Sequence, residues 1–126
     1  MVKPLLVGVD VHRKANAISL MDGTGAELCS CFNVPNNRPG TEKLAQTIAQ
    51  HMSSGSFDTV RVAAEATGWY WWHFFRTLEC DPALAQWPQD LFPFNPRLTA
   101  NFKKTYVDLD HADPIDAFVA ADRLRM

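Results

Sequence analysis

The chain has 126 residues, a hydrophobic content of 47% and a formal net charge of −2 at pH 7. This length favours a single domain with its own core, and the hydrophobic content excludes an intrinsically disordered chain. The charge excludes the strongly basic balance of a stand-alone nucleic-acid binder, while allowing local basic patches beside an acidic site.

Cysteine usage and hydropathy both indicate a cytoplasmic protein. The chain has three cysteines, an odd number, which argues against a disulfide framework and for a reducing compartment. Cys29 and Cys31 fall two apart in a predicted strand, so we expect them on one face of it as ordinary packing residues. The N-terminal apolar run is short and carries Asp10, unlike a signal peptide. No run reaches the roughly 18 apolar residues that suggest a membrane span, so we expect none.

Three strands are predicted at the start of the chain. Residues 4–11 form a short apolar run that is typical of a buried strand. Residues 15–21 and 26–34 flank the turn sequence DGTG at 22–25, which favours a hairpin. We therefore expect the three strands to form an antiparallel meander.

A helix and a fourth strand follow. Thr41 comes directly after a Pro-Gly breaker and is the expected N-cap of a helix that ends in the Ser-rich stretch 53–56. The apolar positions of this helix are Leu44, Ala45, Ile48, Ala49 and Met52. Residues 58–66 then predict a strand, with Val60, Val62 and Ala64 on its apolar face.

Two more helices and a fifth strand complete the predicted order β-β-β-α-β-α-β-α. Residues 69–79 carry apolar side chains at i, i+3, i+4 and i+7, which predicts a helix. A short strand at 90–94 lies in a Pro-rich stretch, and an Ala-rich helix spans 114–126 without a stop signal. We expect a mixed α/β sheet in which strands one, four and five pair in parallel, because parallel strands need crossover helices. The hairpin strands would lie at one edge, with helices packed on the sheet.

Acidic residues end two of the expected parallel strands. Asp10 lies at the C-terminal end of the first strand, and Glu65 at the C-terminal end of the fourth. Ligands gather at the carboxyl ends of strands in open α/β sheets, so we expect the two carboxylates to face each other there. Adjacent carboxylates repel, and a divalent cation such as Mg²⁺ relieves the repulsion because it prefers oxygen ligands.

A second pair of acids opens the last predicted helix. Asp113 and Asp116 lie on either side of Pro114, a residue that favours the first helical position. The same sequence also fits a helix N-cap with an acid in the first turn, which is a purely structural role. The recurrence of acids at three corresponding places favours a metal site. Its predicted members are Asp10, Glu65, Asp113 and Asp116.

Four stretches of the sequence resemble one family of DNA-recombining enzymes. In chain order they are GVDVHRKANAISLMD, EATG, NPRLTANFKKTYVDLDHADPIDA and AADRLR. With these stretches the chain resembles, over essentially its whole length, the N-terminal part of the DEDD transposases of the IS110 group, whose kin include the Piv-type site-specific DNA invertases. The four acids of that family fall on Asp10, Glu65, Asp113 and Asp116.

The resemblance implies a fold, a chemistry and partners. The fold would be an RNase H-like domain over residues 1–126, similar to the Holliday-junction resolvase RuvC. The four acids would hold Mg²⁺ (or Mn²⁺) for phosphodiester cleavage and strand transfer on DNA. The family also implies a guide RNA transcribed from the element, and we expect the full-length protein to be a homo-oligomer.

Two features depart from the family pattern. The family has Lys-Thr or Lys-Ser just before its last two acids, whereas this chain has His111 and Ala112, which removes a cation from beside the acids. The family's C-terminal domain, which carries a serine regarded as the nucleophile, is absent from this sequence. We therefore expect the chain to be part of a longer protein and not to complete recombination alone.

Basic residues close to the predicted acids in the sequence are candidates for contacts with a nucleic-acid backbone, which carries a charge on every phosphate. Ordinary solvation of surface charge explains each of them equally well. The candidates are Arg13, Lys14, Arg97, Lys103 and Lys104.

The remaining aromatic and histidine residues are predicted to have structural roles. Trp69, Tyr70 and Trp72 project away from the apolar stripe of their helix, and packing in the core or against a partner domain is favoured over base stacking. The histidines outside the last acidic stretch form no metal-ligand set and are expected to be ordinary surface or core residues. They are His12, His51 and His73.

Two alternatives to a metal-dependent transposase domain stay open at this point. The chain could be a non-catalytic fragment that binds nucleic acid or mediates dimerisation. It could also be a nuclease of the resolvase type that acts alone on branched DNA. Metal-dependent DNA cleavage separates the catalytic hypotheses from the non-catalytic one.

Overall fold

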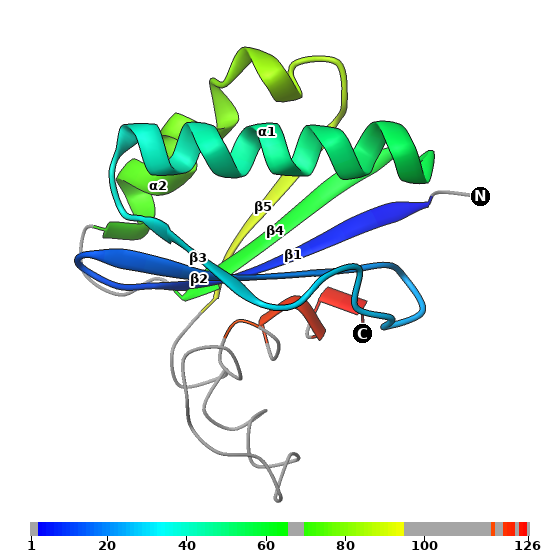
Figure 1. Cartoon of the computed structure of the whole chain (residues 1–126), viewed down its shortest axis with the longest axis horizontal. Helices are drawn as coiled ribbons and strands as arrows, with labels where there is room; N and C mark the ends of the chain where they lie inside the picture. Colours follow the sequence, from blue (N-terminus) through cyan, green and yellow to red (C-terminus); the bar gives the residue numbers. More distant parts are fainter. Residues whose placement is uncertain (1–2, 66–69, 95–116, 118–119, 123, 126) are drawn as a thin grey trace, which may run out of the picture.

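A five-stranded mixed sheet forms the centre of the molecule (Figure 1). The computed structural model describes residues 3–65, 70–94, 117, 120–122, 124 and 125, without the side chains of Glu65, Tyr70, Trp71 and Phe94. The strands are β1 (Pro4–Val11), β2 (Ala15–Met21), β3 (Phe32–Pro35), β4 (Thr59–Glu65) and β5 (Gln89–Phe94).

The strand order β3-β2-β1-β4-β5 confirms the predicted pairing. Strand β1 lies in the middle, antiparallel to β2 and parallel to β4, and β4 is parallel to β5. The parallel register pairs Val9 with Ala64, so the C-terminal ends of β1 and β4 lie side by side. Because each parallel pair is joined through a helix, the predicted alternation of strands and helices already contained this topology.

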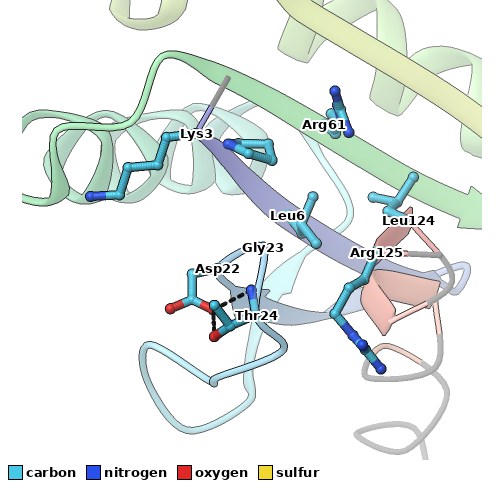
Figure 2. A pocket seen from close by; sticks show the side chains of 9 residues that line it. Lys3, Leu6, Asp22, Gly23, Thr24, Arg61, Leu124 and Arg125 are labelled. Atoms are coloured by element: carbon cyan, nitrogen blue, oxygen red, sulfur yellow. Dashed lines mark hydrogen bonds between the residues drawn. The ribbon is translucent and has the colours of Figure 1, made fainter. Parts of the chain in front are cut away.

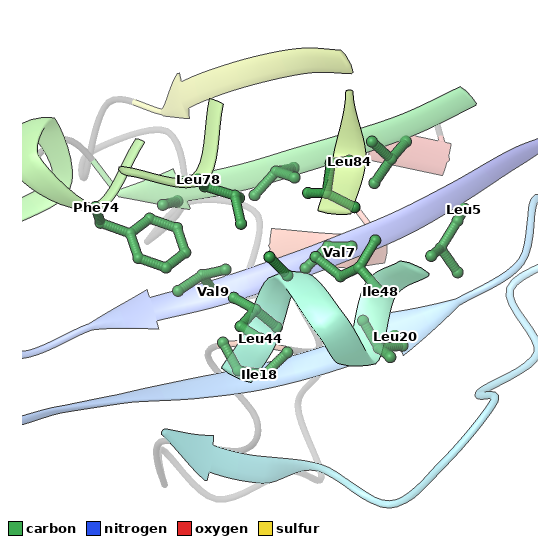
Figure 3. Packing of buried hydrophobic residues seen from close by; sticks show 14 of the residues in the cluster. Leu5, Val7, Val9, Ile18, Leu20, Leu44, Ile48, Phe74, Leu78 and Leu84 are labelled. Carbon is green, nitrogen blue, oxygen red and sulfur yellow. The ribbon is translucent and has the colours of Figure 1, made fainter. Parts of the chain in front are cut away.

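Two helices, α1 (Arg38–Gly55) and α2 (Tyr70–Glu79), cover one face of the sheet (Figure 1). The predicted apolar face of β4 points to them, since Val60, Val62 and Ala64 are fully buried in the main core. Figure 3 shows how side chains from both layers interlock in this core. Full burial of one Leu or Ile side chain stabilises the fold by about 1.5–3 kcal/mol. The labelled residues are Leu5, Val7, Val9, Ile18, Leu20, Leu44, Ile48, Phe74, Leu78 and Leu84.

Helix α1 begins before the predicted N-cap. Asn37, not Thr41, is the cap, and its side chain accepts a hydrogen bond of 2.8 Å from the backbone N–H of Gly40. The Pro-Gly pair does not interrupt the helix, because proline suits the first helical turn. A Cβ atom on Gly40 would overlap the carbonyl oxygen of Pro35 at the end of β3. Gly40 is therefore required by the close approach of α1 to β3. In the sequence alone, the same glycine indicates the end of a regular element.

The predicted third strand over 26–34 is wrong in its first half. After the turn, only Glu27 forms a bridge, to Met21, and strand β3 starts at Phe32, opposite Ile18. The segment between these two pairings is longer than the part of β2 that it opposes, so it bulges away from the ladder. Cys29 and Cys31 lie in this segment, outside β3, and not on one face of a strand as expected.

A short 3-10 helix that the sequence did not predict, η1 (Pro82–Leu84), joins α2 to β5. The Asp81 side chain caps it by accepting a hydrogen bond of 2.9 Å from the backbone N–H of Ala83. This turn buries Leu84 completely in the main core. The Pro-rich stretch between helix and strand thus contributes to the packing and is not a plain loop.

The opposite face of the sheet carries the described residues near the C-terminus, drawn in red in Figure 1. The described residues of the predicted helix 114–126 are helical, namely 117, 120–122, 124 and 125. Ala117 and Ala121 come so close to Gly8 of β1 that a Cβ atom there would overlap their backbone. Leu6 and Met21 form a second, smaller core with Ala121 and Leu124. Helix and sheet therefore approach each other through small residues near the middle of β1.

In the part of the chain that is described, none of the helices combines the length and the apolar character needed to span a membrane. Five strands in a mixed sheet, with helices on both faces, agree with the RNase H-like α/β fold expected from the sequence. This architecture brings the C-terminal ends of β1 and β4, which carry Asp10 and Glu65, to one edge of the sheet.

Candidate functional site

Asp10 is the best-defined residue of the predicted metal site. It is the next-to-last residue of β1 and only 7% exposed. Its strand neighbours Val9 and Val11 point into the main core beneath α1 and α2. Because side chains alternate along a strand, Asp10 points to the opposite face, together with Leu6 and Gly8. A carboxylate is thus buried on the face that the C-terminal helical residues cover, at the carboxyl edge of the sheet.

One partner of Asp10 in the structure is a histidine. Nε2 of His12 lies 2.8 Å from Oδ2 of Asp10, and the His12 side chain is about half exposed at 49%. Sequence reasoning assigned His12 an ordinary role and missed this contact. The signal was available, because residues two apart at the end of a strand share a face. The hydrogen bond restrains the orientation of the carboxylate.

Glu65 occupies the register position next to Asp10 on the neighbouring strand. The register pairs Val9 with Ala64, and each residue is followed directly by an acid. On its other side Glu65 pairs with Phe94 of β5. The prediction that strands one and four are neighbours, with an acid ending each, is therefore confirmed for the backbone. The side chain of Glu65 lies outside the described structure.

The turn between β1 and β2 presents the two basic candidates that the structure describes. His12, Arg13 and Lys14 are all exposed there. The turn is held by the Asn36 side chain, whose Nδ2 donates to the carbonyl of His12 at 2.6 Å. The backbone N–H of Asn36 also donates to the carbonyl of Lys14 at 2.9 Å. Arg13 and Lys14 thus project from a fixed turn beside Asp10.

Asn16 braces the same turn from inside the sheet. It is completely buried, and its Oδ1 accepts a hydrogen bond of 3.3 Å from the backbone N–H of His12. Its Nδ2 is buried and has no hydrogen-bond acceptor among the described residues. An unsatisfied buried donor is costly, so this amide is retained at the cost of some stability. The Asn16 side chain stabilises the backbone of the turn that carries His12.

The structure describes only part of the predicted site. Asp113 and Asp116 lie outside the described residues, as do Arg97, Lys103 and Lys104. Within the described part, no three His, Cys, Asp or Glu side chains are close enough to hold a metal ion. The structure therefore brings Asp10 and the backbone of Glu65 together, and the other two acids stay a prediction.

Two of the three cysteines, Cys29 and Cys31, are partly buried as expected of packing residues, whereas Cys80 is exposed. Cys29 is half buried against the main core, and Cys31 is also half buried. Burial raises the pKa of both thiols above the ordinary value of 9.0, and the nearby Glu27 carboxylate raises it further. Both side chains are therefore protonated at neutral pH, and a thiol is a poor metal ligand compared with a thiolate.

Aromatic side chains of α2 divide between core and surface. Phe74, Phe75 and Leu78 are buried, as the helical stripe predicted. Trp72 is 47% exposed, and the Arg76 guanidinium lies 5.6 Å from the centre of its ring. Trp69 and the Tyr70 side chain lie outside the description. Trp72 therefore packs partly under an arginine on the outer surface of the helix.

Comparison with known proteins gives one clear result. A search of curated proteins found no match for the chain. The model of a family named DEDD_Tnp_IS110, described as "Transposase", matches residues 7–126. The matched range contains Asp10, Glu65 and the C-terminal helical residues that pack against Gly8, and its family is the one that the four sequence stretches resemble. The chain belongs to the IS110-type family of DEDD transposases and is a transposase domain with an RNase H-like fold.

Proposed function

We propose that Asp10, Glu65, Asp113 and Asp116 hold divalent metal, Mg²⁺ or Mn²⁺, for phosphodiester cleavage and strand transfer of an insertion sequence. The observation that carries the proposal is the adjacent register of Asp10 and Glu65 at the carboxyl ends of two parallel strands. The donor chemistry fits, because Mg²⁺ prefers carboxylate oxygens and Asp10 supplies them from a buried position.

The direction of the C-terminal helical residues supports the inclusion of the other two acids. Leu124 packs near Leu6, whereas Ala117 packs against Gly8, two residues further along β1. These residues therefore run antiparallel to β1, so their N-terminal end, at Ala117, is the one nearer to Asp10. Asp116 precedes Ala117 directly in the sequence. This direction favours a place for the acid pair near Asp10.

The described residues have distinct parts in this proposal. Divalent ions can activate an attacking oxygen and stabilise a leaving oxygen in phosphodiester chemistry. His12 fixes the orientation of the Asp10 carboxylate through the bond of 2.8 Å. Arg13 and Lys14, on their fixed turn, contact the phosphates that flank the reacting bond. Binding through these two side chains would weaken as the salt concentration rises.

The remaining partners belong to the same proposal. A guide RNA transcribed from the element would select the DNA. Residues 1–126 would form one domain of a longer cytoplasmic protein, whose second domain carries the nucleophilic serine, and the full-length protein would be a homo-oligomer. The family membership supports these assignments through the known organisation of the relatives that the sequence resembles.

Titration of the purified chain with Mn²⁺ or Mg²⁺ tests the metal site. A ligand that binds only the folded state raises its stability, so the melting temperature should rise with metal concentration. Asp10→Asn and Asp113→Asn should each abolish the rise, whereas Glu79→Gln, at an exposed end of α2, should leave it unchanged. Equal stabilisation of the wild type and both aspartate variants would show that these acids hold no metal.

A further inference from the structure

Trp72 presents an aromatic ring to solvent from the first turn of α2. It is the third residue of this helix and is 47% exposed. The apolar stripe of the helix is buried in the main core and consists of Phe74, Phe75 and Leu78. Residues of one stripe recur at three and four positions along a helix, so Trp72 lies beside this stripe and outside the core.

The start of α2 is tied to the end of the sheet that carries the proposed metal site. Strand β4 ends at Glu65, next to Asp10, and α2 begins at Tyr70. The chain between Glu65 and Tyr70 can span at most roughly 18 Å, which keeps the first turn of α2 close to this edge. Figure 1 shows α2 beginning at the same end of the sheet as the β1–β2 turn. Asp10 points to the other face, so a strand that reaches both Asp10 and Trp72 crosses the carboxyl edge of the sheet.

Arg76 restrains the indole ring of Trp72. Its guanidinium lies 5.6 Å from the ring centre, which is the distance of a cation–π contact. The two residues are one helical turn apart, so the contact also fixes the side of α2 on which the ring lies. A ring that is already restrained loses less conformational freedom when a ligand stacks on it.

Charge does not attract an anion to the C-terminal end of α2. Two arginines and two carboxylates line the groove there, namely Arg38, Arg76, Glu42 and Asp81. Arg38 pairs with Glu42 at 3.0 Å, and the exposed Glu79 adds a further negative charge. Contact with a nucleic acid at α2 therefore depends on stacking, and the phosphate contacts belong to the β1–β2 turn.

The surroundings of Trp72 fit a single base better than a second protein. Its neighbours His73 and Arg76 are exposed polar residues. Among the described residues, the other large hydrophobic residue that is exposed is Phe92. Phe92 points to the opposite face of the sheet, because the adjacent Leu91 packs against the main core. Contiguous apolar patches mark protein interfaces, whereas a base needs only one ring on which to stack.

The opposite end of β1 offers no comparable stacking surface. A pocket of about 370 Å³ lies there, and Figure 2 shows Lys3, Arg61 and Arg125 around it. Two of these cations have carboxylates nearby, since Arg61 lies 3.9 Å from Asp90 and Arg125 lies 2.7 Å from Asp122. None of the described residues that line this pocket is aromatic. A base therefore finds a ring at the carboxyl edge of the sheet and not in this pocket.

We propose that Trp72 stacks on one unpaired base of the DNA strand on which the domain acts, while Arg13 and Lys14 bind phosphates of the same strand. This inference rests on the proposed function for the place of the reaction, at the edge that carries Asp10 and Glu65. It defines the substrate more closely. Both faces of a base in a duplex are covered by its neighbours, so the bound DNA is locally unpaired beside the reacting bond.

Binding of two fluorescent DNA probes in EDTA tests the proposal without any contribution from the metal site. One probe is a single strand of about 12 nucleotides, and the other is a duplex of the same length. Trp72→Ala should weaken the binding of the single strand about tenfold and leave the affinity for the duplex unchanged. Trp72→Tyr should restore most of the affinity, because a phenol ring also stacks on a base. Arg76→Met should weaken the binding of the single strand about threefold, because it removes the cation–π contact.

Photochemical crosslinking of the wild-type chain locates the contact and does not depend on the folding of a variant. A single strand that carries iodouracil in place of thymine should crosslink to Trp72, and mass spectrometry of the peptides identifies the modified residue. Gln46→Ala, at an exposed position of α1, is the control and should change neither affinity.

Four results would overturn the proposal. They are a wild-type chain that does not bind the single strand, an unchanged affinity of Trp72→Ala for it, an equal loss of affinity for both probes, and crosslinks that map elsewhere. If Trp72→Ala alters the sedimentation of the chain but not its affinity for DNA, the indole is a protein contact instead. Because all of these measurements are made in EDTA, they can fail while the metal titration succeeds, and the reverse.

Discussion

Nε2 of His12 lies 2.8 Å from Oδ2 of Asp10. His12, the first residue after β1, therefore contacts the carboxylate that lies near the C-terminal end of that strand. Asp10 is 7% exposed, whereas the His12 side chain is about half exposed. A buried carboxylate is thereby connected to the surface turn that carries Arg13 and Lys14. Outer hydrogen-bonding partners of this kind orient metal ligands in many proteins.

Replacement of His12 should weaken metal binding without unfolding the chain. His12→Ala should lower the affinity for Mn²⁺ about tenfold, because the Asp10 carboxylate loses the partner that orients it. His12→Gln should retain most of the affinity, since an amide nitrogen can reach the same position. Calorimetric titration measures the affinity, and thermal melting checks the fold. Equal affinities for wild type and His12→Ala would show that the contact is irrelevant to the metal.

Replacement of Gly8 in β1 should lower the stability of the fold. A Cβ atom there would overlap the backbone of Ala117 and Ala121. Gly8→Ala should therefore lower the free energy of unfolding by about 1–3 kcal/mol through overpacking. Gly23→Ala is the matched control, because the nearest atom to its Cβ would be Cδ of Pro4 at 3.7 Å. Urea denaturation of the two variants measures the difference, and equal midpoints would contradict the packing described here.

The cap of α1 should be worth about 1 kcal/mol. Asn37→Ala removes the side chain that accepts the hydrogen bond from the backbone of Gly40, and loss of an N-cap typically costs that amount. Asn37→Asp should keep the stability, since a carboxylate accepts the same bond and favours the helix N-terminus. The free energy of unfolding from urea denaturation gives the result. A stable Asn37→Ala variant would place the start of α1 elsewhere.

The Asp22 carboxylate should make the free energy of unfolding decrease as the pH falls into the acid range. The Thr24 hydroxyl bond is the main cause that lowers its pKa from the ordinary 3.8, with smaller contributions from backbone N–H groups of Ala26 and Thr24. The group therefore contributes stability above its unfolded pKa, and this contribution is lost as pH falls through the lower folded value. Asp22→Asn should unfold at a lower urea concentration than wild type at pH 7, and the gap should narrow below pH 3.8. A gap that is constant with pH would contradict the shift.

The central sheet was predictable from sequence because its signals are local and repeated. The alternation of apolar residues in β4 placed Val60 and Val62 in the core, and the crossover helices required parallel pairing of β1 with β4. The start of α1 and the extent of β3 were not predictable, because both depend on contacts between distant segments. Gly40 meets Pro35 across a close approach, and the pairing of β2 moves from Glu27 to Phe32 across a bulge.

In the candidate site, too, the features with local sequence signals could be predicted, and those that depend on distant segments could not. Asp10 and Glu65 could be placed side by side because each ends a strand whose register follows from the topology. The contact of His12 with Asp10 had a signal in the sequence, because the two residues are two apart at a strand end, but the path of the turn that completes it is fixed by Asn16 and Asn36.

The central position of β1 also governs the order in which this chain can fold. Its antiparallel partner β2 follows after a short turn, so that pairing closes quickly, whereas β4 reaches β1 only after α1 has been made. Non-local strand pairing raises the contact order and slows the search for the native state. Until β4 arrives, the most apolar strand of the sheet has an open edge, which is the kind of surface on which nascent chains aggregate.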